Sequence, residues 1–266
     1  MWALLAWARR QNQQKLVDDT PNVSLAATQT GQAIGSTATD NTALLAPTAN
    51  VVAAAAVTPP AFVQVNAATP QTNQSSVGVT YTGAQVAGDT NILAIGWNNA
   101  TSTITSVTDS AGNTYQLAVP TARGGGVSQA IYYAPNIKAA AAGTNTVTVN
   151  FNTATPYVDI RALEYSGLDP VNPFAVGTSA SGTGTTANSG TVTAPANALI
   201  FGAGITGGVF SAGGANFTTR IITVPDADIA EDRIVTAAGP YSATAPVSGA
   251  WVMQVAIFKP AAASMV

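Results

Sequence analysis

The sequence predicts an all-β protein, a two-sheet β-sandwich of jelly-roll or Ig-like type, preceded by a short N-terminal helix and an extended N-terminal arm. From Ala61 onward, short runs of alternating apolar and polar residues are separated by Gly, Pro, Asn and Asp, as in sandwich domains. The apolar residues make up 47% of the chain but are mostly Ala and Val, and only 7% of residues are aromatic. Such a composition suits closely apposed sheets better than a helical bundle.

Residues 1–18 are predicted to form the helix, because they are rich in Ala, Leu, Gln, Arg and Lys and contain neither Gly nor Pro before Pro21. The helix could pack on its own domain or on a neighbouring molecule, or lie on a membrane surface. Its apolar run Trp2–Ala8 is too short to span a bilayer, so we expect no integral membrane segment. That run also lacks a preceding basic stretch and is followed by Arg9 and Arg10, which argues against a conventional secretion signal.

Residues 19–60 are predicted to be an extended arm or linker. The segment is rich in Thr, Ala, Asn, Ser and Gln, carries no charge after Asp19 except Asp40, and ends at Pro59 and Pro60. Such a composition cannot form a core of its own. The arm either adds a strand to the sheet of a neighbouring copy or serves as a tether.

Residues 61–260 are predicted to form the sandwich, followed by a tail at 261–266. The clearest alternation is Asn145–Phe151, in which Val147, Val149 and Phe151 share one face. Residues 105–117 are expected to form a hairpin, with Asp109 bonded to its turn and positive φ angles at Gly112 and Asn113. Further strands are expected over Val77–Tyr81, Leu93–Trp97, Val127–Tyr133, Tyr157–Tyr165, Leu199–Ala203 and Trp251–Ile257.

Composition argues against several classes of function. The net charge is −3 and the nine basic residues are scattered from Arg9 to Lys259, so no basic patch for nucleic acid is expected. Without His or Cys, the chain cannot build a Ser-His-Asp, Cys-His or thiolate-metal centre. A glycosidase using only carboxylates would need a pair such as Asp159 and Glu164, but nothing around them indicates a cleft. We therefore expect no enzyme activity and no cofactor.

The densest group of acidic residues is the segment 226–232. Its four carboxylates could supply oxygen ligands for Ca²⁺ in a surface loop. The absence of a central Gly distinguishes the segment from an EF-hand loop. The alternative is that the acids pair with Arg220 and Arg233. The candidate metal ligands are Asp226, Asp228, Glu231 and Asp232.

Glu164 is predicted to point inward, because Ile160 and Ala162, four and two residues before it, fit the core face of the same strand. A buried carboxylate must be paired, hydrogen-bonded or protonated. One possibility is that it promotes an isopeptide bond between an Asn and Lys138 or Lys259. The alternatives are a bulge at Glu164 or a partner such as Arg161.

Several motifs in succession resemble a recurrent β-sandwich module of large bacterial secreted and surface proteins. The resemblance covers about residues 61–258 and rests on SVTDSAGNTYQLAV, SQAIYYAPNI, NTVTVNF, DIRALEYSGLDPVNPF, RIITVPDADIAEDRIVTAAGPYSATAP and WVMQVAIF. It implies a sandwich architecture and a location at the cell surface or outside the cell. It implies no reaction and supplies no catalytic residues.

These observations favour a non-enzymatic structural subunit that assembles with other copies of itself, through its arm, into an extracellular filament, a surface layer or a particle such as a virion. The alternative is a carbohydrate-binding or adhesive module. Its aromatic residues could stack on sugars, although their alternating positions on strands also fit core packing. These aromatics are Trp97, Tyr115, Tyr132, Tyr133, Tyr157, Tyr165 and Trp251.

Overall fold

The computed structural model describes residues 58–262, and these confirm that the domain is all-β. They contain strands β1 to β17, every paired strand is antiparallel to its neighbour, and no helix is present among them. None of these residues therefore provides a helical membrane span. The predicted helix 1–18, the arm up to residue 57 and the last four residues of the tail lie outside the described residues.

The N-terminal half of the domain consists of one five-stranded sheet covered on its outer face by a three-stranded sheet. In the five-stranded sheet the order is β1 (Ala61–Ala68), β8 (Asp159–Ser166), β3 (Thr90–Trp97), β6 (Val127–Ala134) and β5 (Gln116–Gly124). In the covering sheet the order is β2 (Gln74–Thr80), β7 (Thr146–Thr155) and β4 (Ile104–Asp109).

The C-terminal half has a second five-stranded sheet, covered by two short ribbons. The sheet order is β13 (Thr218–Ile222), β14 (Ile229–Ile234), β12 (Leu199–Thr206), β17 (Trp251–Phe258) and β9 (Phe174–Gly182). The ribbons pair β10 (Thr186–Asn188) with β16 (Thr244–Pro246) and β11 (Val192–Ala194) with β15 (Gly239–Tyr241).

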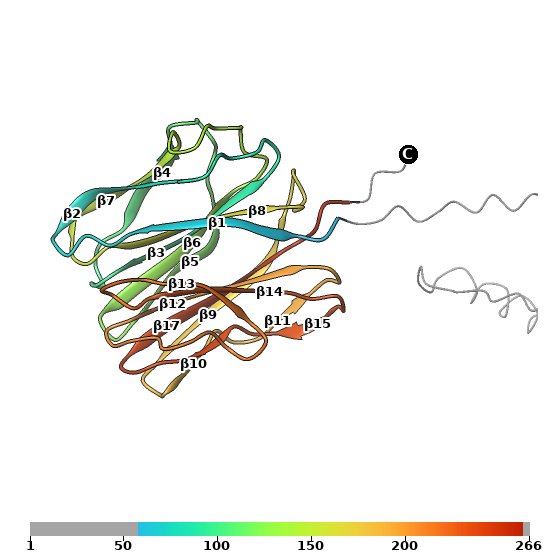
Figure 1. Ribbon diagram of the computed structural model, residues 1–266. Coiled ribbons are helices and arrows are strands. Elements are labelled where there is room, and N and C mark those ends of the chain that lie inside the picture. Colours follow the sequence, from blue (N-terminus) through green and yellow to red (C-terminus); the bar gives the residue numbers. More distant parts are fainter. Residues whose placement is uncertain (1–57, 263–266) are drawn as a thin grey trace, which may run out of the picture. The chain divides into compact units, whose positions relative to one another are not determined.

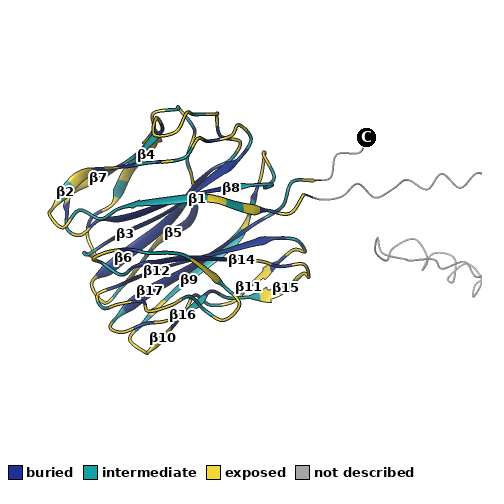
Figure 2. Ribbon diagram, in the orientation of Figure 1, coloured by how far each residue is buried: buried dark blue, intermediate teal, exposed yellow. Residues whose placement is uncertain are grey.

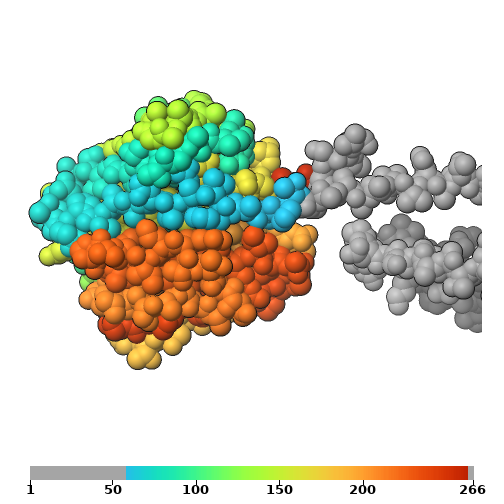
Figure 3. All heavy atoms as spheres, viewed as in Figure 1, coloured from blue at the N-terminus to red at the C-terminus, as the bar shows by residue number. Residues whose placement is uncertain are grey.

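The two five-stranded sheets pack against each other, so the domain has four layers rather than the two that we expected (Figure 1). Ile92 and Leu163 of the first sheet meet Phe201 and Phe258 of the second in the central core. One outer core lies under β2 and β7, and the other lies under the ribbons. In the space-filling view the two halves are in contact along their length (Figure 3).

The central strands are buried on both faces because layers cover both faces of their sheets. Every residue of β3, β12 and β17 is buried, and only Ser166 of β8 is partly exposed (Figure 2). The predicted alternation is confirmed where it was clearest, since Val147, Val149 and Phe151 of β7 face the core and the residues between them are half-buried.

The two halves share one strand topology. The order β1-β8-β3-β6-β5 in the first sheet corresponds to β9-β17-β12-β14-β13 in the second, in the same sequence along the chain. The covering strands repeat as well. In the first half β2 pairs with β7. At the corresponding place in the second half β10 pairs with β16, and β11 pairs with β15. The bridge between Phe210 and Val247 takes the place of the β4–β7 pairing. The domain is therefore an internal structural duplication.

The expected hairpin over residues 105–117 is wrong. Strand β4 pairs with β7 in the covering sheet, and β5 pairs with β6 in the five-stranded sheet, so residues 110–115 cross between two layers. The local turn chemistry is partly as predicted: Asp109 accepts a hydrogen bond from the Asn113 backbone N–H at 2.9 Å, and Gly112 has a φ of 72°. Asn113 is not in the positive-φ region. Its side chain donates to Asp109 instead.

Candidate functional site

The four acidic residues predicted as calcium ligands are divided among different surroundings. Asp226 lies in the loop between β13 and β14, and Asp228 immediately precedes β14. Glu231 and Asp232 are neighbours within β14, so their side chains point to opposite faces of the sheet. The structure therefore does not gather the four carboxylates into one set of ligands.

Asp232 lies on the inner face of β14, where the two five-stranded sheets meet. Its Oδ2 accepts hydrogen bonds from the Tyr165 hydroxyl and from Arg220 Nε, both at 2.7 Å. The Arg220 guanidinium also covers the Phe62 ring, 4.2 Å from its centroid. The pairing of an acid with Arg220 is thus present, whereas Arg233 instead lies over the ring of Tyr241.

Glu231 lies on the outer face of β14 and is fully buried. Its Oε2 accepts a hydrogen bond from the Gly214 backbone N–H at 2.7 Å, and among the described residues Oε1 has no hydrogen-bond partner. Burial raises the pKa of Glu231 to about 7, and the neighbouring Asp232 carboxylate adds to this rise. The side chain is therefore a buried acid that titrates close to neutral pH.

A second buried polar cluster joins the two halves around Arg161 of β8. Arg161 Nη1 donates to the backbone carbonyls of Gly204 and Ile229 at 2.7 and 2.6 Å, and Nη2 donates to the Gln129 side chain at 2.9 Å. Its Nε lies 2.8 Å from Asp159 Oδ1, at an angle that makes an ion pair but no hydrogen bond. One guanidinium thus crosses from the first sheet to the backbone of the second.

Asp228 brings a further carboxyl group to this cluster. Asp228 Oδ1 accepts a hydrogen bond from the Thr206 backbone N–H at 2.9 Å. The Thr223 hydroxyl accepts a hydrogen bond from the Asp228 backbone N–H and donates one to Asp159. Burial raises the pKa of both Asp159 and Asp228, and their mutual repulsion raises that of Asp228 further, while Arg161 opposes these effects. Two carboxyl groups therefore share one cation inside the domain.

A polar pocket of about 210 Å³ opens beside this cluster, at the junction of the two halves. Asn98 and Tyr157 come from the first half, and Asp226 and Asp228 from the second. Asp226 is held by Gln71, whose Nε2 lies 2.9 and 3.0 Å from its two carboxylate oxygens. Among residues 58–262 no group of three or more acidic side chains is arranged to hold a metal ion. The pocket offers acceptors and one half-exposed aromatic ring to a polar ligand.

Glu164 is fully buried, as the alternation in its strand predicted. It accepts hydrogen bonds from the Gln64 side chain and the Val86 backbone N–H. Burial and the adjacent Glu164 carboxylate raise the pKa of Asp89 to about 6. Among the described residues Glu164 is therefore bonded to Gln64 and the Val86 backbone and lies beside Asp89, whereas Arg161 lies in the cluster between the two halves.

Neither lysine of the described domain is placed to react beside Glu164. Lys138 Nζ donates to the Gly112 carbonyl at 3.0 Å, and Lys259 Nζ lies 3.9 Å from Asp169 Oδ2. The structure thus provides no setting for the isopeptide bond considered from the sequence.

Most of the aromatic residues considered for sugar stacking are packed in the interior. Trp97 and Tyr165 are fully buried, and Trp251 and Tyr133 are each only 7% exposed. The exception is Tyr157, which is 44% exposed at the edge of the polar pocket and has a φ of 45°, unusual for a residue with a side chain. The packing of these aromatics leaves one ring available to a ligand at this pocket.

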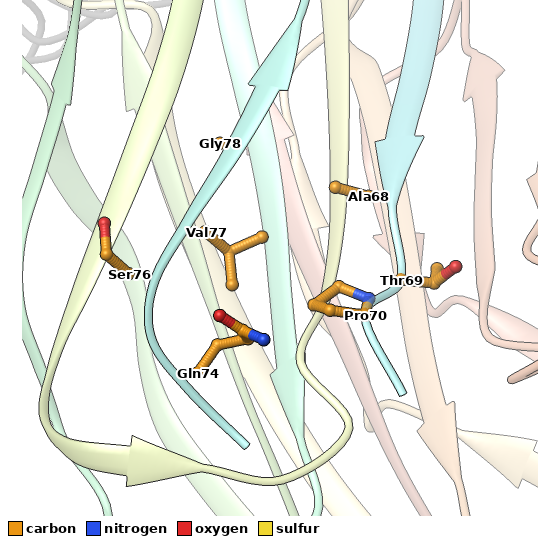
Figure 4. A pocket seen from close by; sticks show the side chains of 7 residues that line it. All are labelled: Ala68, Thr69, Pro70, Gln74, Ser76, Val77 and Gly78. Atoms are coloured by element: carbon orange, nitrogen blue, oxygen red, sulfur yellow. The ribbon is translucent and has the colours of Figure 1, made fainter. Parts of the chain in front are cut away.

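The edges of two sheets meet beside a groove of about 510 Å³, lined by the end of β1 and the start of β2 (Figure 4). Strand β1 is the edge of a five-stranded sheet, and β2 is the edge of the sheet that covers it. Sequence reasoning missed this groove because it depends on which strands lie at edges. The groove lining comprises Ala68, Thr69, Pro70, Gln74, Ser76, Val77 and Gly78.

Comparison with protein families, with curated proteins and with solved structures gave no match to this chain. Fold and candidate sites together define residues 58–262 as an all-β domain of stacked antiparallel sheets, with a groove between the edge strands β1 and β2 and a small polar pocket at the junction of its two halves.

Proposed function

We propose that the chain is a non-enzymatic structural subunit that assembles with other copies of itself through its N-terminal arm. The observation that supports this most strongly is the pair of open strand edges, β1 and β2, beside an uncharged groove. Unpaired edges expose backbone N–H and C=O groups that can pair with a strand from another chain. The long segment before β1, residues 19–60, in which Asp19 and Asp40 are the charged residues, would supply such a strand.

The setting proposed for this assembly is an extracellular filament, a surface layer or the surface of a particle. The low share of charged residues, 8% of the chain, reduces repulsion between identical copies that pack closely.

Removal of residues 1–57 from the full chain tests this proposal. We expect the shortened protein to keep the circular dichroism spectrum of a β-protein but to lose assembly, as seen by negative-stain electron microscopy. Assembly by the shortened protein as by the full chain would contradict a role for the arm.

A second candidate function is carbohydrate binding at the polar pocket. The half-exposed Tyr157 ring beside Asn98, Asp226 and Asp228 combines a stacking surface with hydrogen-bond acceptors, which is what a sugar ring requires. Binding on a glycan array that disappears in Tyr157→Ala, but not in the control Tyr132→Phe, a change at a half-buried tyrosine outside the pocket, would support this function. Absence of binding across a broad array would count against it.

A further inference from the structure

The edges of β1 and β2 lack two of the features that protect sheet edges from pairing with other chains, charged residues and Pro. Edge strands are commonly protected by charged residues, Pro or bulges. Register shifts do not distinguish the edges here, because β1 and β2 have them as β4, β5 and β13 do. However, β5 contains Pro120 and Arg123, β4 ends at Asp109, and β13 contains Arg220. Strand β9 lies against β5 and β11. Neither β1 (AFVQVNAA) nor β2 (QSSVGVT) contains a charged residue or Pro.

Side chains bridge the space between β1 and β2 at one end only. Asn66 Nδ2 donates to the Thr80 carbonyl at 2.8 Å, and Gln64 exchanges two hydrogen bonds with the Gly83 backbone, at 2.8 and 3.3 Å. Toward Ala68 no such bridge is present among the described residues, and the groove opens there (Figure 4). The open part thus lies at the end of β1 farthest from Ala61.

We propose that residues 52–57 (VAAAAV) of a second copy lie in this groove as an added strand that pairs with an edge of β1 or β2. The inference rests on the proposed function, and it names the segment and the surface that meet. No charged side chain lines the groove, and the segment carries none. The segment belongs to the longest apolar run of the arm, 51–57, and its Ala side chains match a lining that includes Ala68, Ser76 and Gly78.

The reach of the chain favours another copy as the source of this segment. The seven residue steps from Ala61 to Ala68 span about 23 Å, and the groove lies about that far from Ala61. The seven steps from Ala54 to Ala61 extend to about 25 Å at most, so Ala54 of the same copy would reach the groove only if the whole segment ran straight back along β1. Within one copy the chain would also have to reverse its direction at Pro59 and Pro60, whose φ angles are restricted.

The geometry also favours an open assembly over a closed dimer. The described chain enters β1 at Ala61, and β1 runs from there across the first half of the domain (Figure 1). The groove lies at the opposite end of the same strand, where Ala68 is part of its lining. Donor and acceptor surfaces are therefore different patches at opposite ends of the domain. Head-to-tail contacts between different patches continue from copy to copy unless the rotation closes a ring.

Disulfide trapping between two differently labelled copies tests the inference in the full chain, which has no native Cys. One copy carries Ser76→Cys, and the other carries Ala54→Cys or, separately, Ala55→Cys. Because Ser76 is exposed on the solvent face of β2, an added strand should present one of these two positions to it and turn the other away. We expect a mixed disulfide dimer for one position and little for the other, and none with Thr218→Cys of β13 as the control acceptor.

An isosteric change of charge tests the same contact without a cross-link. Gln74 points into the groove (Figure 4), and Gln74→Glu would place a carboxylate against the added strand. We expect self-association to weaken by about tenfold or more, because the carboxylate would lose water beneath the added strand and gain only the neutral Thr72 hydroxyl, which now accepts a hydrogen bond from Gln74 Nε2 at 2.9 Å. Gln116→Glu, at the exposed start of β5, makes the same change away from the groove and should leave association unchanged.

The outcomes separate this inference from the proposed function. Self-association without a mixed disulfide at either position, and with no effect of Gln74→Glu, would overturn the docking site but leave arm-mediated assembly standing. A disulfide formed only within one doubly substituted copy, and never between copies, would overturn the role of a second copy. A full chain that remains monomeric would overturn the proposed function itself.

Discussion

At the scale of single residues, Arg161 is a side chain that joins the two halves directly. It is fully buried, pairs with Asp159 and donates to two carbonyls of the second sheet. Removal of one partner from a buried ion pair leaves an uncompensated charge, which usually costs several kcal/mol.

We therefore expect Arg161→Met to lower the free energy of unfolding by about 3–5 kcal/mol in urea titrations. Adding Asp159→Asn to this variant should recover part of the loss, because the unpaired carboxylate is then removed. Arg233→Met, which removes only the contact with the Tyr241 ring, should cost less than about 1 kcal/mol. A loss below about 1 kcal/mol in Arg161→Met would contradict this role.

Glu231 makes the stability depend on pH. Its pKa rises from 4.5 to about 7 in the folded state, so the folded protein binds this proton more tightly than the unfolded chain does. The free energy of unfolding should accordingly fall as the pH rises from about 4.5 through about 7. Asp89, with a pKa raised to about 6, acts in the same direction.

In Glu231→Gln we expect the difference in urea midpoint between pH 5 and pH 8 to shrink, because the residue no longer titrates. Asp169→Asn serves as the control: hydrogen bonds from the Val171 and Asn172 backbone lower the pKa of Asp169, so it stays charged over this range. An unchanged pH dependence in Glu231→Gln would show that Glu231 is not the titrating group.

For single residues, the sequence predicted which face of a strand a side chain points to better than it predicted which residues that side chain contacts. Period two placed Glu164 inside, and the structure confirms it. The same rule places Glu231 and Asp232 on opposite faces, but the dense run 226–232 suggested one shared site. The partners Tyr165 and Gly214 could not be inferred, because they come from strands and loops far along the chain.

At the scale of elements, the number of layers was underestimated although a signal for it is present. Strands β3 (TNILAIGW) and β17 (WVMQVAIF) are nearly continuous apolar runs, which indicates burial on both faces. The prediction of a two-sheet sandwich rested only on the alternate residues that share one face of each strand. The strand positions themselves were predictable, but the pairing partners of β4 and β5 were not, because each pairs across a layer.

The junction of Pro59 with Gly167 fixes where the chain enters β1. Gly167 has a φ of 73°, and a Cβ added there would lie 2.6 Å from the Pro59 carbonyl oxygen. We expect Gly167→Ala to lower the free energy of unfolding by about 1–3 kcal/mol in urea titrations, through both backbone strain and this clash.

Gly143→Ala is the matched control, because Gly143 has a φ of 71° but nothing within 4 Å of an added Cβ. Gly143→Ala should lower the free energy of unfolding only through backbone strain, by about 1 kcal/mol. Equal losses in the two variants would mean that Pro59 does not press against Gly167.

At the scale of the whole molecule, two halves of one topology are packed through their five-stranded sheets. The duplication was not apparent in the sequence, because the cover of the second half consists of three-residue strands and a single bridge. The corresponding central strands, TNILAIGW and LIFGAGIT, share only a pattern of small and aliphatic residues. The two halves therefore share the order in which their strands pair but not a sequence similarity that would reveal it.

The duplication leaves the two halves with different edges, and this difference underlies the proposed assembly. In the first half the edge strands β1 and β2 contain no charged residue or Pro, whereas in the second half β9, which corresponds to β1, lies against β5 and β11. In our proposal, β1 and β2 are the edges at which a growing chain of copies would add.

Sedimentation velocity of the full chain across a hundredfold range of concentration tests this account most directly. We predict that the sedimentation coefficient rises steadily with concentration, and that Gln74→Glu shifts this rise to a concentration about tenfold higher. A single species of 26.6 kDa at every concentration would contradict the account.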